Sequence, residues 1–236
     1  MIFSSKTNYR LELHLNDFLF YVFNEQRLEH YDFIIKFDYY PFLVNMSNIK
    51  KQLIHVASDT FSKYGYYKTA MEDIAKAAQK AKGSLYYHFG SKELLFEAVV
   101  LQELDKLKEE LTQVFADKNS DTRTVIHSYM LKRMEVLRNA PNYQETLRPN
   151  FYEHYDFVNS VKENMVSWEV AQLVILIERG VANHELDLPG DYKVYAQVLV
   201  MLLQGLEPNF YLKGEYDRLE SHFDNLIKII TKGIST

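Results

Sequence analysis

One short stretch of the chain concentrates hydroxyl, ammonium and imidazole groups around a glycine. It runs Lys80-Ala-Lys-Gly-Ser-Leu-Tyr-Tyr-His88, and a further lysine follows at Lys92. Hydroxyl and ammonium groups bind phosphate oxygens, and tyrosine rings pack on sugars and thymine methyl groups. Gly83 has no side chain, so another backbone can come close to it. These residue types therefore predict contact with a nucleic-acid groove rather than a chemical reaction.

Three helices are predicted to position this stretch. Leu53, Ala57 and Phe61 recur at helical spacing, and Gly65 follows as a C-terminal stop. Thr69-Ala-Met-Glu72 has the pattern of a capping box that opens the second helix. The order of parts is that of a helix-turn-helix, with the polar stretch on its third helix.

The second and third helices are predicted to cross through small and apolar residues. Ala75 and Ala78 allow a close approach, and Leu85 points inward. The other core positions expected in this three-helix unit are Phe61, Ile74, Phe89 and Leu94. This arrangement leaves the polar and aromatic side chains of the third helix facing outward or along its edge.

Positive charge is concentrated around the motif, although the chain is acidic overall. The 236 residues carry a net charge of −5, whereas residues 46–93 hold eight lysines and four acidic residues, a net charge of +4. A phosphate-binding face requires such a patch, and a solvated helix surface is the alternative. We favour the phosphate-binding interpretation because the motif lies in the same window.

The composition excludes several other classes of protein. Apolar residues make up 47% of the chain and charged residues 25%, as in an ordinary globular protein. The lack of cysteine excludes disulfides and thiolate metal sites and fits a cytoplasmic setting. The apolar run Phe18–Phe23 is too short to span a membrane, and no signal-peptide pattern is present. Nucleotide-binding, hydrolase and metalloprotease motifs are missing, so we expect no enzyme, no cofactor and no metal site.

On these residues the segment resembles the N-terminal domain of the TetR family of bacterial transcriptional regulators. The matching residues are Thr69, Asp73, Ile74, Ala75, Ala78, Lys82, Gly83, Leu85, Tyr86, Phe89, Ser91, Lys92 and Leu95, with Ser84 in place of the usual threonine. The resemblance implies an all-α fold, in which an N-terminal three-helix DNA-binding domain precedes a larger helical domain. It further implies that this larger domain binds a small effector and dimerises through its last two helices.

The residues expected to contact DNA come from the third helix, the turn before it and two helix starts. They are Thr69, Lys80, Lys82, Gly83, Ser84, Tyr86, Tyr87, His88 and Lys92. Thr69 and Lys92 are included because each is predicted at a helix N-terminus, where backbone N–H groups and the helix dipole favour an anion.

Three residues in the turn depart from the family pattern. Gln79 replaces the usual glycine, Lys80 the usual apolar residue and Ala81 the usual N-capping serine. A non-glycine residue in the left-handed region costs about 1 kcal/mol, and a lost N-cap costs about the same. We therefore expect a looser recognition helix than most. Lys80 either gains a phosphate contact or reflects neutral change, and both interpretations stay open.

The rest of the chain has a helical pattern throughout. One helix is expected to start at Ser91 and to run to about Phe115. Further helices are predicted at 122–139, 142–155, 157–183, 191–207 and 216–233, separated by proline and glycine. Residues 46–95 are assigned to the DNA-binding domain, and residues 96–236 to the helical ligand-binding and dimerisation domain.

The last two predicted helices carry more apolar surface than one core can cover. Val194, Val198, Met201 and Gly205 form one stripe, and Tyr195, Leu199, Leu202 and Leu206 form another. In the last helix, apolar residues recur with the spacing of a helix-packing seam. We therefore expect a homodimer with Val194, Val198, Met201, Gly205, Leu219, Phe223, Leu226 and Ile230 in its interface. The alternative is a central core helix of a monomer.

Aromatic and methionine residues crowd the stretch 129–168. The expected lining of an effector pocket is Tyr129, Met134, Tyr152, Tyr155, Met165 and Trp168. Plain core packing is the alternative for each of these residues, since aromatic residues at helical spacing usually belong to the core.

Residues 1–45 are assigned separately. Their apolar periodicity is mixed, alternating at Leu11, Leu13 and Leu15 and then running without a break. We expect an extension upstream of a natural start at Met46, or a poorly ordered segment. The alternative is an N-terminal arm that packs on the body.

Together these patterns predict a dimeric, sequence-specific DNA-binding transcriptional regulator. It would act as a repressor that a small-molecule effector releases from a palindromic operator, with no membrane partner. The alternative is a helical dimeric binding or assembly protein whose DNA-binding helix has decayed, which the departures at residues 79–81 keep open.

Overall fold

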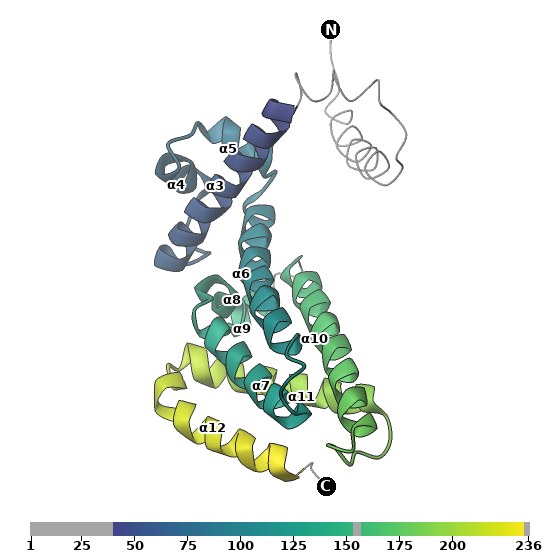
Figure 1. Ribbon diagram of the computed structural model, residues 1–236. Coiled ribbons are helices and arrows are strands. Elements are labelled where there is room, and N and C mark those ends of the chain that lie inside the picture. The colour runs from purple at the N-terminus through teal and green to yellow at the C-terminus, as the bar shows by residue number, and fades with distance from the viewer. Residues whose placement is uncertain (1–39, 153–156, 234–236) are drawn as a thin grey trace, which may run out of the picture. The chain divides into compact units, whose positions relative to one another are not determined.

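The computed structural model describes residues 40–152 and 157–233, and every regular element in that part of the chain is a helix (Figure 1). The predicted all-α fold is therefore confirmed. The chain divides by its contacts into Met1–Lys51 and Gln52–Thr236, and the second unit holds every helix from α4 onward and the end of α3. Among the described residues, no helix has the length and apolar character needed to cross a membrane.

Three helices form the helix-turn-helix unit: α3 (Tyr40–Tyr64), α4 (Met71–Ala77) and α5 (Lys82–His88). Gly65 ends α3 as predicted, with φ of +84° and its N–H donating to the carbonyl of Phe61 at 2.7 Å. Helix α3 runs through Met46 without a break, and most of the segment assigned as an extension, residues 1–39, lies outside the described residues.

The core of this unit follows the predicted pattern with one exception. Its buried members are Leu53, Ala57, Phe61, Ile74, Ala75, Ala78, Leu85 and Phe89. Leu94 was expected among them, but half of its surface is exposed, and the next residue, Leu95, is fully buried instead. Ser91 caps the following helix by accepting the N–H of Leu94, and the resulting helical phase turns Leu95 inward.

The predicted capping box at Thr69 and Glu72 is wrong by one residue. The N-cap of α4 is Ala70, whose N–H donates to the Asp73 carboxylate at 3.0 Å. An alanine has no oxygen to return the second bond, so only half of the box forms. Thr69 is buried, and its hydroxyl donates to the carbonyl of Gly65 at 2.8 Å.

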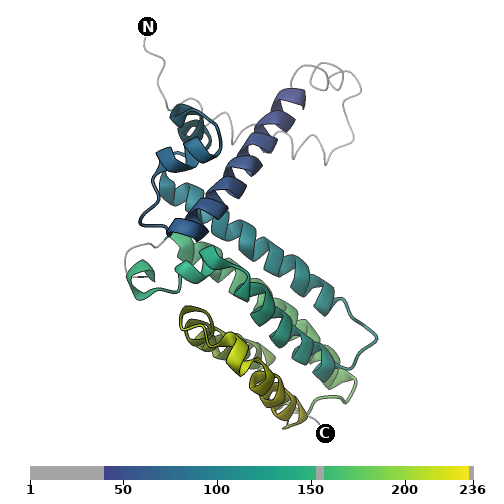
Figure 2. The same ribbon diagram turned by 90° about the vertical axis from the view of Figure 1, so that its left-hand side faces the viewer.

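The remaining elements form a helical body. Three long helices pack side by side: α6 (Lys92–Phe115), α7 (Thr122–Arg138) and α10 (Phe157–Ala182) (Figures 1 and 2). The single helix predicted at 142–155 is wrong, because α8 (Pro141–Glu145) and α9 (Pro149–Tyr152) are separate. Pro149 lacks an N–H and its ring disfavours continuation of the preceding helix.

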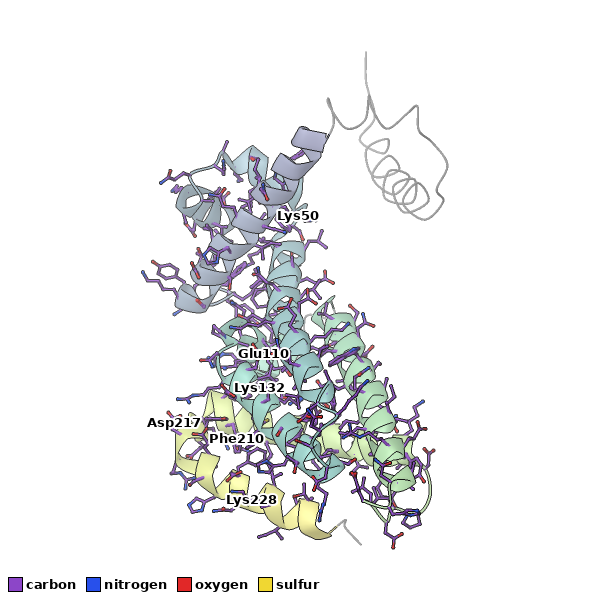
Figure 3. All side chains as sticks on the ribbon, viewed as in Figure 1. Lys50, Glu110, Lys132, Phe210, Asp217 and Lys228 are labelled. Carbon is purple, nitrogen blue, oxygen red and sulfur yellow. The ribbon has the colours of Figure 1, made fainter. Side chains whose placement is uncertain are left out.

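The last elements are α11 (Tyr192–Glu207), a π-helix η1 (Pro208–Leu212) and α12 (Tyr216–Gly233). Helix α11 packs on α10, and α12 packs on α7 (Figure 2). Phe210 of η1 anchors α12, with its ring centroid 5.7 Å from that of Tyr216 and 5.4 Å from that of Phe223 (Figure 3).

Candidate nucleic-acid interface and ligand pocket

Helix α5 presents a polar and aromatic face to solvent while one residue anchors it. Leu85 is fully buried, and this fixes which side of the helix points outward. Tyr86 and Tyr87 are exposed, Tyr87 by 67%, and Ser84 lies partly open beside them. A Cβ at Gly83 would meet no atom within 4 Å, so the glycine borders open space. The predicted outward face of the helix is therefore the one observed.

The cations of this face differ in their surroundings. Lys80 is exposed in the turn. Lys82 forms an ion pair with Glu72 of α4, and its ammonium lies 5.7 Å from the centroid of the Tyr86 ring. The hydrogen bond that Lys82 donates to the Glu72 carboxylate raises the pKa of Lys82. His88 is half-buried, and its ring lies 5.2 Å from that of Tyr87.

The turn between α4 and α5 has the two weaknesses that the sequence predicts. Gln79 adopts φ of +54°, the left-handed region that favours glycine. Ala81 is the N-cap of α5 and supplies no side-chain hydrogen bond. The turn is nevertheless closed by backbone, since Lys80 N–H donates to the carbonyl of Ala75 at 2.9 Å.

Two residues predicted to contact phosphate point elsewhere. The ammonium of Lys92 donates to the carbonyls of Tyr66 and Thr69, at 3.0 and 3.2 Å, and lies 4.2 Å from the centroid of the Tyr66 ring. Partial burial lowers the pKa of this ammonium. Lys92 thus ties the segment before α4 to the start of α6, and the buried Thr69 side chain closes the turn within that segment, so neither faces outward.

A buried ion network lies inside the helical body. Arg133 of α7 donates through Nε to Glu169 of α10 at 2.8 Å and through Nη1 to Glu207 of α11 at 2.7 Å. The hydroxyl of Tyr129 donates to Glu169 at 2.5 Å, and that of Tyr143 donates to Glu207 at 2.7 Å. All five side chains are buried, so the network joins four helices in a region without bulk water.

Most residues predicted to line an effector pocket belong instead to the core. Tyr129 and Met134 are fully buried, and Tyr129 is a member of the ion network. Trp168 packs its ring against Phe115 at 6.0 Å between centroids. Met165 borders only a small inner cavity. The side chain of Tyr152 and the whole of Tyr155 lie outside the described residues.

The body does contain a pocket, but other residues line it. This outer pocket has a volume of about 880 Å³ and is lined by Tyr143, Thr146, Leu147, Pro149, Asn159, Lys162, Glu163, Val166, Ser167, Gln204 and Glu207. The inner cavity behind it, about 10 Å³, shares Tyr143, Lys162, Val166 and Gln204. The outer pocket is of the size that small-molecule sites have.

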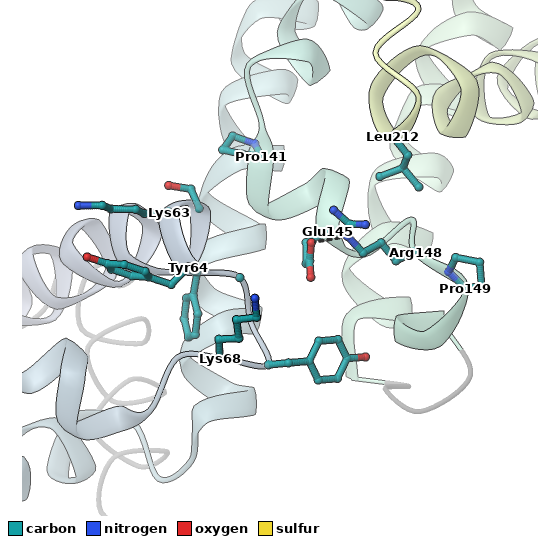
Figure 4. A pocket seen from close by; sticks show the side chains of 12 residues that line it. Lys63, Tyr64, Lys68, Pro141, Glu145, Arg148, Pro149 and Leu212 are labelled. Atoms are coloured by element: carbon teal, nitrogen blue, oxygen red, sulfur yellow. Dashed lines mark hydrogen bonds and ion pairs between the residues drawn. The ribbon is translucent and has the colours of Figure 1, made fainter.

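A second cleft of about 620 Å³ lies where the helix-turn-helix unit meets α8 and α9 (Figure 4). Lys63, Tyr64 and Lys68 belong to one wall, and Pro141, Glu145 and Arg148 belong to the other. Arg148 and Glu145 pair with each other at 2.7 Å. Tyr129, Met134, Met165 and Trp168, the predicted effector-pocket residues whose side chains the structure describes, do not border this cleft.

Helix α8 connects the outer pocket with the helix-turn-helix unit. The Asn142 amide donates to the carbonyl and the hydroxyl of Ser58 in α3, at 3.3 and 3.1 Å. The Glu103 carboxylate of α6 accepts the N–H groups of Asn142 and Tyr143. Tyr143, the next residue, lines the pocket. Adjacent residues of one helix therefore touch the pocket on one side and α3 on the other.

The ion network and Lys162 were missed at the level of sequence, although a signal was present. Arg133, Glu169 and Glu207 each lie four positions after an apolar residue that is buried or part of the core pattern: Tyr129, Met165 and Leu203. A charge in register with an apolar helix stripe indicates a buried ion pair. For Lys162, only the packing of α8, α10 and α11 shows that its side chain lies at a pocket.

The predicted dimer residues are mostly exposed apolar groups. Val194, Val198 and Met201 of α11 and Leu226 and Ile230 of α12 are open to solvent, Met201 by 66%, and Gly205 borders open space. Leu219 is half-buried. Phe223 differs, because it is buried against Phe210 within its own chain.

The buried side of α11 is neither of the two predicted stripes. The buried residues are Ala196, Val200, Leu203 and Glu207, whereas Tyr195 and Leu202 of the expected second stripe face solvent, Leu202 by 61%. The exposed apolar face of α11 is therefore wider than the sequence indicated.

Comparison with known proteins agrees with this geometry. The family model for bacterial regulatory proteins of the tetR family matches residues 53–99. RutR, an HTH-type transcriptional regulator of Escherichia coli strain K12, is 37% identical over 92 residues, which are 39% of this chain and 42% of RutR. QacR, an HTH-type transcriptional regulator of Staphylococcus aureus strain Mu50, is 29% identical over 120 residues, 50% of this chain and 61% of QacR.

These matches span less than two thirds of the length of either relative. A solved structure covers more of the chain. The crystal structure of a transcriptional regulator from Cytophaga hutchinsonii ATCC 33406 superposes with a TM-score of 0.63 at 25% identity, over 79% of this chain and 98% of that one. Residues 53–99 therefore match the tetR family of bacterial regulatory proteins, and the helices of that segment have the helix-turn-helix arrangement.

Proposed function

We propose that this protein is a sequence-specific DNA-binding transcriptional regulator, a repressor that a small-molecule effector releases from its operator. The observation that carries the proposal is the outward face of α5. A buried leucine locks the helix, two exposed tyrosines and a serine project from it, and an open glycine lets a DNA backbone come close. RutR and QacR, which are similar to part of this chain, are transcriptional regulators.

The DNA-contacting residues that we propose are Lys80, Lys82, Gly83, Ser84, Tyr86, Tyr87 and His88. Hydroxyl and ammonium groups would bind phosphates, and the tyrosine rings would reach sugars and base edges in the major groove. We assign Thr69 and Lys92 a positioning role instead, because their polar atoms are used within the unit.

We further propose a homodimer formed through the exposed apolar faces of α11 and α12. Such faces are costly to leave in water, and a second copy would cover them. A dimer also presents two recognition helices to half-sites about one DNA turn apart, as a palindromic operator requires. Residues 46–95 would form the DNA-binding part and residues 96–236 the effector-binding and dimerising part.

The route for effector-controlled release that we propose passes through α8. A ligand in the outer pocket would contact Tyr143, and the preceding residue, Asn142, holds α3 through Ser58. A ligand shifts an equilibrium only as far as it binds one state better than the other. Ligand binding that favours a shifted α8 would therefore change the separation of the two recognition helices.

The second candidate function is a helical dimeric binding protein whose DNA-binding helix has decayed. The observations that favour it are local: the strained Gln79 and the missing N-cap at Ala81. The ordered anchoring of Leu85 and the closed backbone of the turn favour the regulator.

Fluorescence anisotropy with DNA from upstream of the protein's own gene, measured across salt concentrations, separates the two functions. A regulator binds this DNA with sequence preference and with a steep dependence on salt. Tyr87→Ala should weaken binding about ten- to hundredfold and alter the sequence preference. Flat and weak binding to every DNA would support the decayed helix.

Lysine substitutions supply a matched pair for the same measurement. Lys80→Ala should weaken binding to all sequences and lower the salt slope by about 1. Lys118→Ala removes the same charge from an exposed loop outside the proposed interface, and it should change neither quantity. Equal effects of the two substitutions would mean that only net charge matters and would remove Lys80 from the interface.

A further inference from the structure

We propose that the effector of this protein is an amphipathic monocarboxylic acid whose carboxylate binds Lys162 in the outer pocket. This inference rests on the proposed function, since it names the ligand class of the site through which DNA binding would be controlled. It is carried by the partners of Lys162, the charges around it and the shape of the pocket.

The ammonium of Lys162 donates no hydrogen bond to a carboxylate of the described residues, although the charge of Glu207 acts on it. Its side chain is half-buried in α10, and its ammonium lies 5.3 Å from the centroid of the Tyr143 ring. No acceptor lies within hydrogen-bonding distance of this ammonium among the residues that the structure describes. The neighbouring carboxylates are already used, because Glu207 accepts from Arg133 and Tyr143. A partly desolvated ammonium in this position gains from an incoming anion.

The surrounding charges restrict that anion to a single negative charge. Lys162 faces the pocket together with the carboxylates of Glu163 and Glu207. Behind them, Arg133 balances only one of Glu169 and Glu207. Arg133 and Lys162 together offset two of these three carboxylates, so a dianion such as a phosphate monoester would add two negative charges to a site with no further cation among the described residues. A carboxylate adds only one, and it can accept the hydrogen bonds that the Lys162 ammonium donates to no described residue.

The pocket also sets the shape of the ligand. Leu147, Pro149, Val166 and the Tyr143 ring supply apolar walls, and the volume of about 880 Å³ accepts a molecule much larger than a carboxylate. The inner cavity beyond Lys162, about 10 Å³, has room for no more than about one water molecule. The charged end of the ligand would therefore stop at the ammonium, with its apolar body toward Leu147 and Pro149.

Isothermal titration of the full-length protein, without DNA, tests this assignment with two matched series of probes. The first is 4-phenylbutyrate, 4-phenylbutanamide and 4-phenylbutylamine, and the second is decanoate, decanamide and decylamine. Within each series the body is constant and the head group is anionic, neutral or cationic. In at least one series the acid should bind about tenfold or more tightly than the amide and the amine.

Variants then connect the preference to the residue. Lys162→Met should abolish the preference for the acid, and Lys162→Arg should keep it, because the guanidinium also pairs with a carboxylate. Glu163→Gln, next in the chain and facing the same pocket, should leave acid binding unchanged or slightly tighter. Unfolding curves for each variant separate loss of binding from loss of folding.

Three results would overturn the proposal: an amide or amine that binds as well as its acid in both series, an acid preference that survives in Lys162→Met, or no saturable binding of either acid. The outcome is independent of the proposed function, because no DNA is present. Acid binding without any effect on DNA would leave the ligand class standing and would contradict the release mechanism.

Discussion

The helix-turn-helix unit and the helical body use the same residue types in opposite ways. On α5, Tyr86 and Tyr87 face solvent beside a lysine that is half exposed. In the body, Tyr129 and Tyr143 are buried and donate to the carboxylates that Arg133 holds. A polar group exposed to water costs little to leave unpaired, whereas a buried one must be paired. The exposed set is thus available for a ligand, and the buried set is committed to the fold.

The difference predicts where substitutions affect stability and where they affect binding. Removing a group from the α5 face should change DNA affinity with little change in the free energy of unfolding. Removing a member of the buried ion network should lower the free energy of unfolding with little direct effect on DNA affinity, since its partners are left as uncompensated charges.

The largest expected effect is that of Arg133→Met. Glu169 and Glu207 would lose their shared cation in a region without water, and the free energy of unfolding should fall by about 3–5 kcal/mol. Denaturant unfolding monitored by the fluorescence of Trp168 measures the change. Arg148→Met is the control, because it removes an exposed arginine paired with Glu145, and it should cost less than about 1 kcal/mol. Similar losses of unfolding free energy in Arg133→Met and Arg148→Met would contradict the contrast between buried and exposed ion pairs.

Alkaline pH should destabilise the body through its buried tyrosines. Burial raises the pKa of Tyr129 and Tyr143 well above the ordinary value and raises that of Tyr216 to about 12. As pH rises above 10, tyrosines of the unfolded state ionise while these do not, so the unfolded state binds fewer protons and stability falls. Unfolding curves measured from neutral pH upward should show this decline, and Tyr216→Phe should make it shallower between pH 10 and 12. If Tyr216→Phe leaves the decline unchanged, the loss of stability comes from the ionisation of other groups.

The junction between the two regions gives an intermediate effect. Asn142→Ala removes the hydrogen bonds to Ser58 and one donor to the half-buried Glu103, so it should cost about 1–3 kcal/mol. DNA affinity should fall as well, although Asn142 lies in α8. Asn139→Ala is the matched control, since its amide donates on the surface to the carbonyl of Glu135, and it should change both quantities little. Unchanged DNA affinity in Asn142→Ala would remove α8 from the proposed route.

The smallest effect concerns the turn before α5. Gln79→Gly should stabilise the protein by about 0.5–1 kcal/mol, because glycine adopts a positive φ without the steric penalty of a Cβ. The gain is limited because glycine also increases the conformational entropy of the unfolded chain. The same substitution at the exposed helical position Gln102 should destabilise by about 1 kcal/mol. Thermal unfolding of the two variants should therefore shift in opposite directions. A shift in the same direction would show that Gln79 is not strained.

Much of the fold was predictable because its signals are local. Periodic apolar residues, proline and glycine mark the helices at 122–138, 157–182 and 216–233 to within a residue or so of the prediction. The alternation of small and apolar residues predicted that Leu85 is buried and that Tyr87 is exposed. The strained turn at Gln79 could also be predicted, since it depends on one residue type at one position of a known motif.

The residues whose role was predicted wrongly depend instead on contacts between segments that are distant in the sequence. The local sequence around a lysine does not show whether its ammonium faces solvent or folds back onto the protein. The carbonyls that accept hydrogen bonds from Lys92 belong to a segment more than twenty residues earlier in the chain. The lining of the outer pocket is likewise assembled from α8, α10 and α11, so aromatic content along 129–168 said little about it. The widened apolar face of α11 became visible only when its buried stripe was known.

By itself, the sequence determined the helical elements, the helix-turn-helix and the side of α5 that meets solvent. Each of these depends on spacing within a few turns of one helix, where 3.6 residues per turn dictate which side chains share a face. Only the tertiary structure decided which polar groups are paired, because hydrogen-bond partners such as Arg133 and Glu207 are separated by 74 residues and meet through packing. This pairing separates the hydrogen-bonded charges of the body from Lys162, whose ammonium donates no hydrogen bond to a carboxylate in the part of the chain that the structure describes.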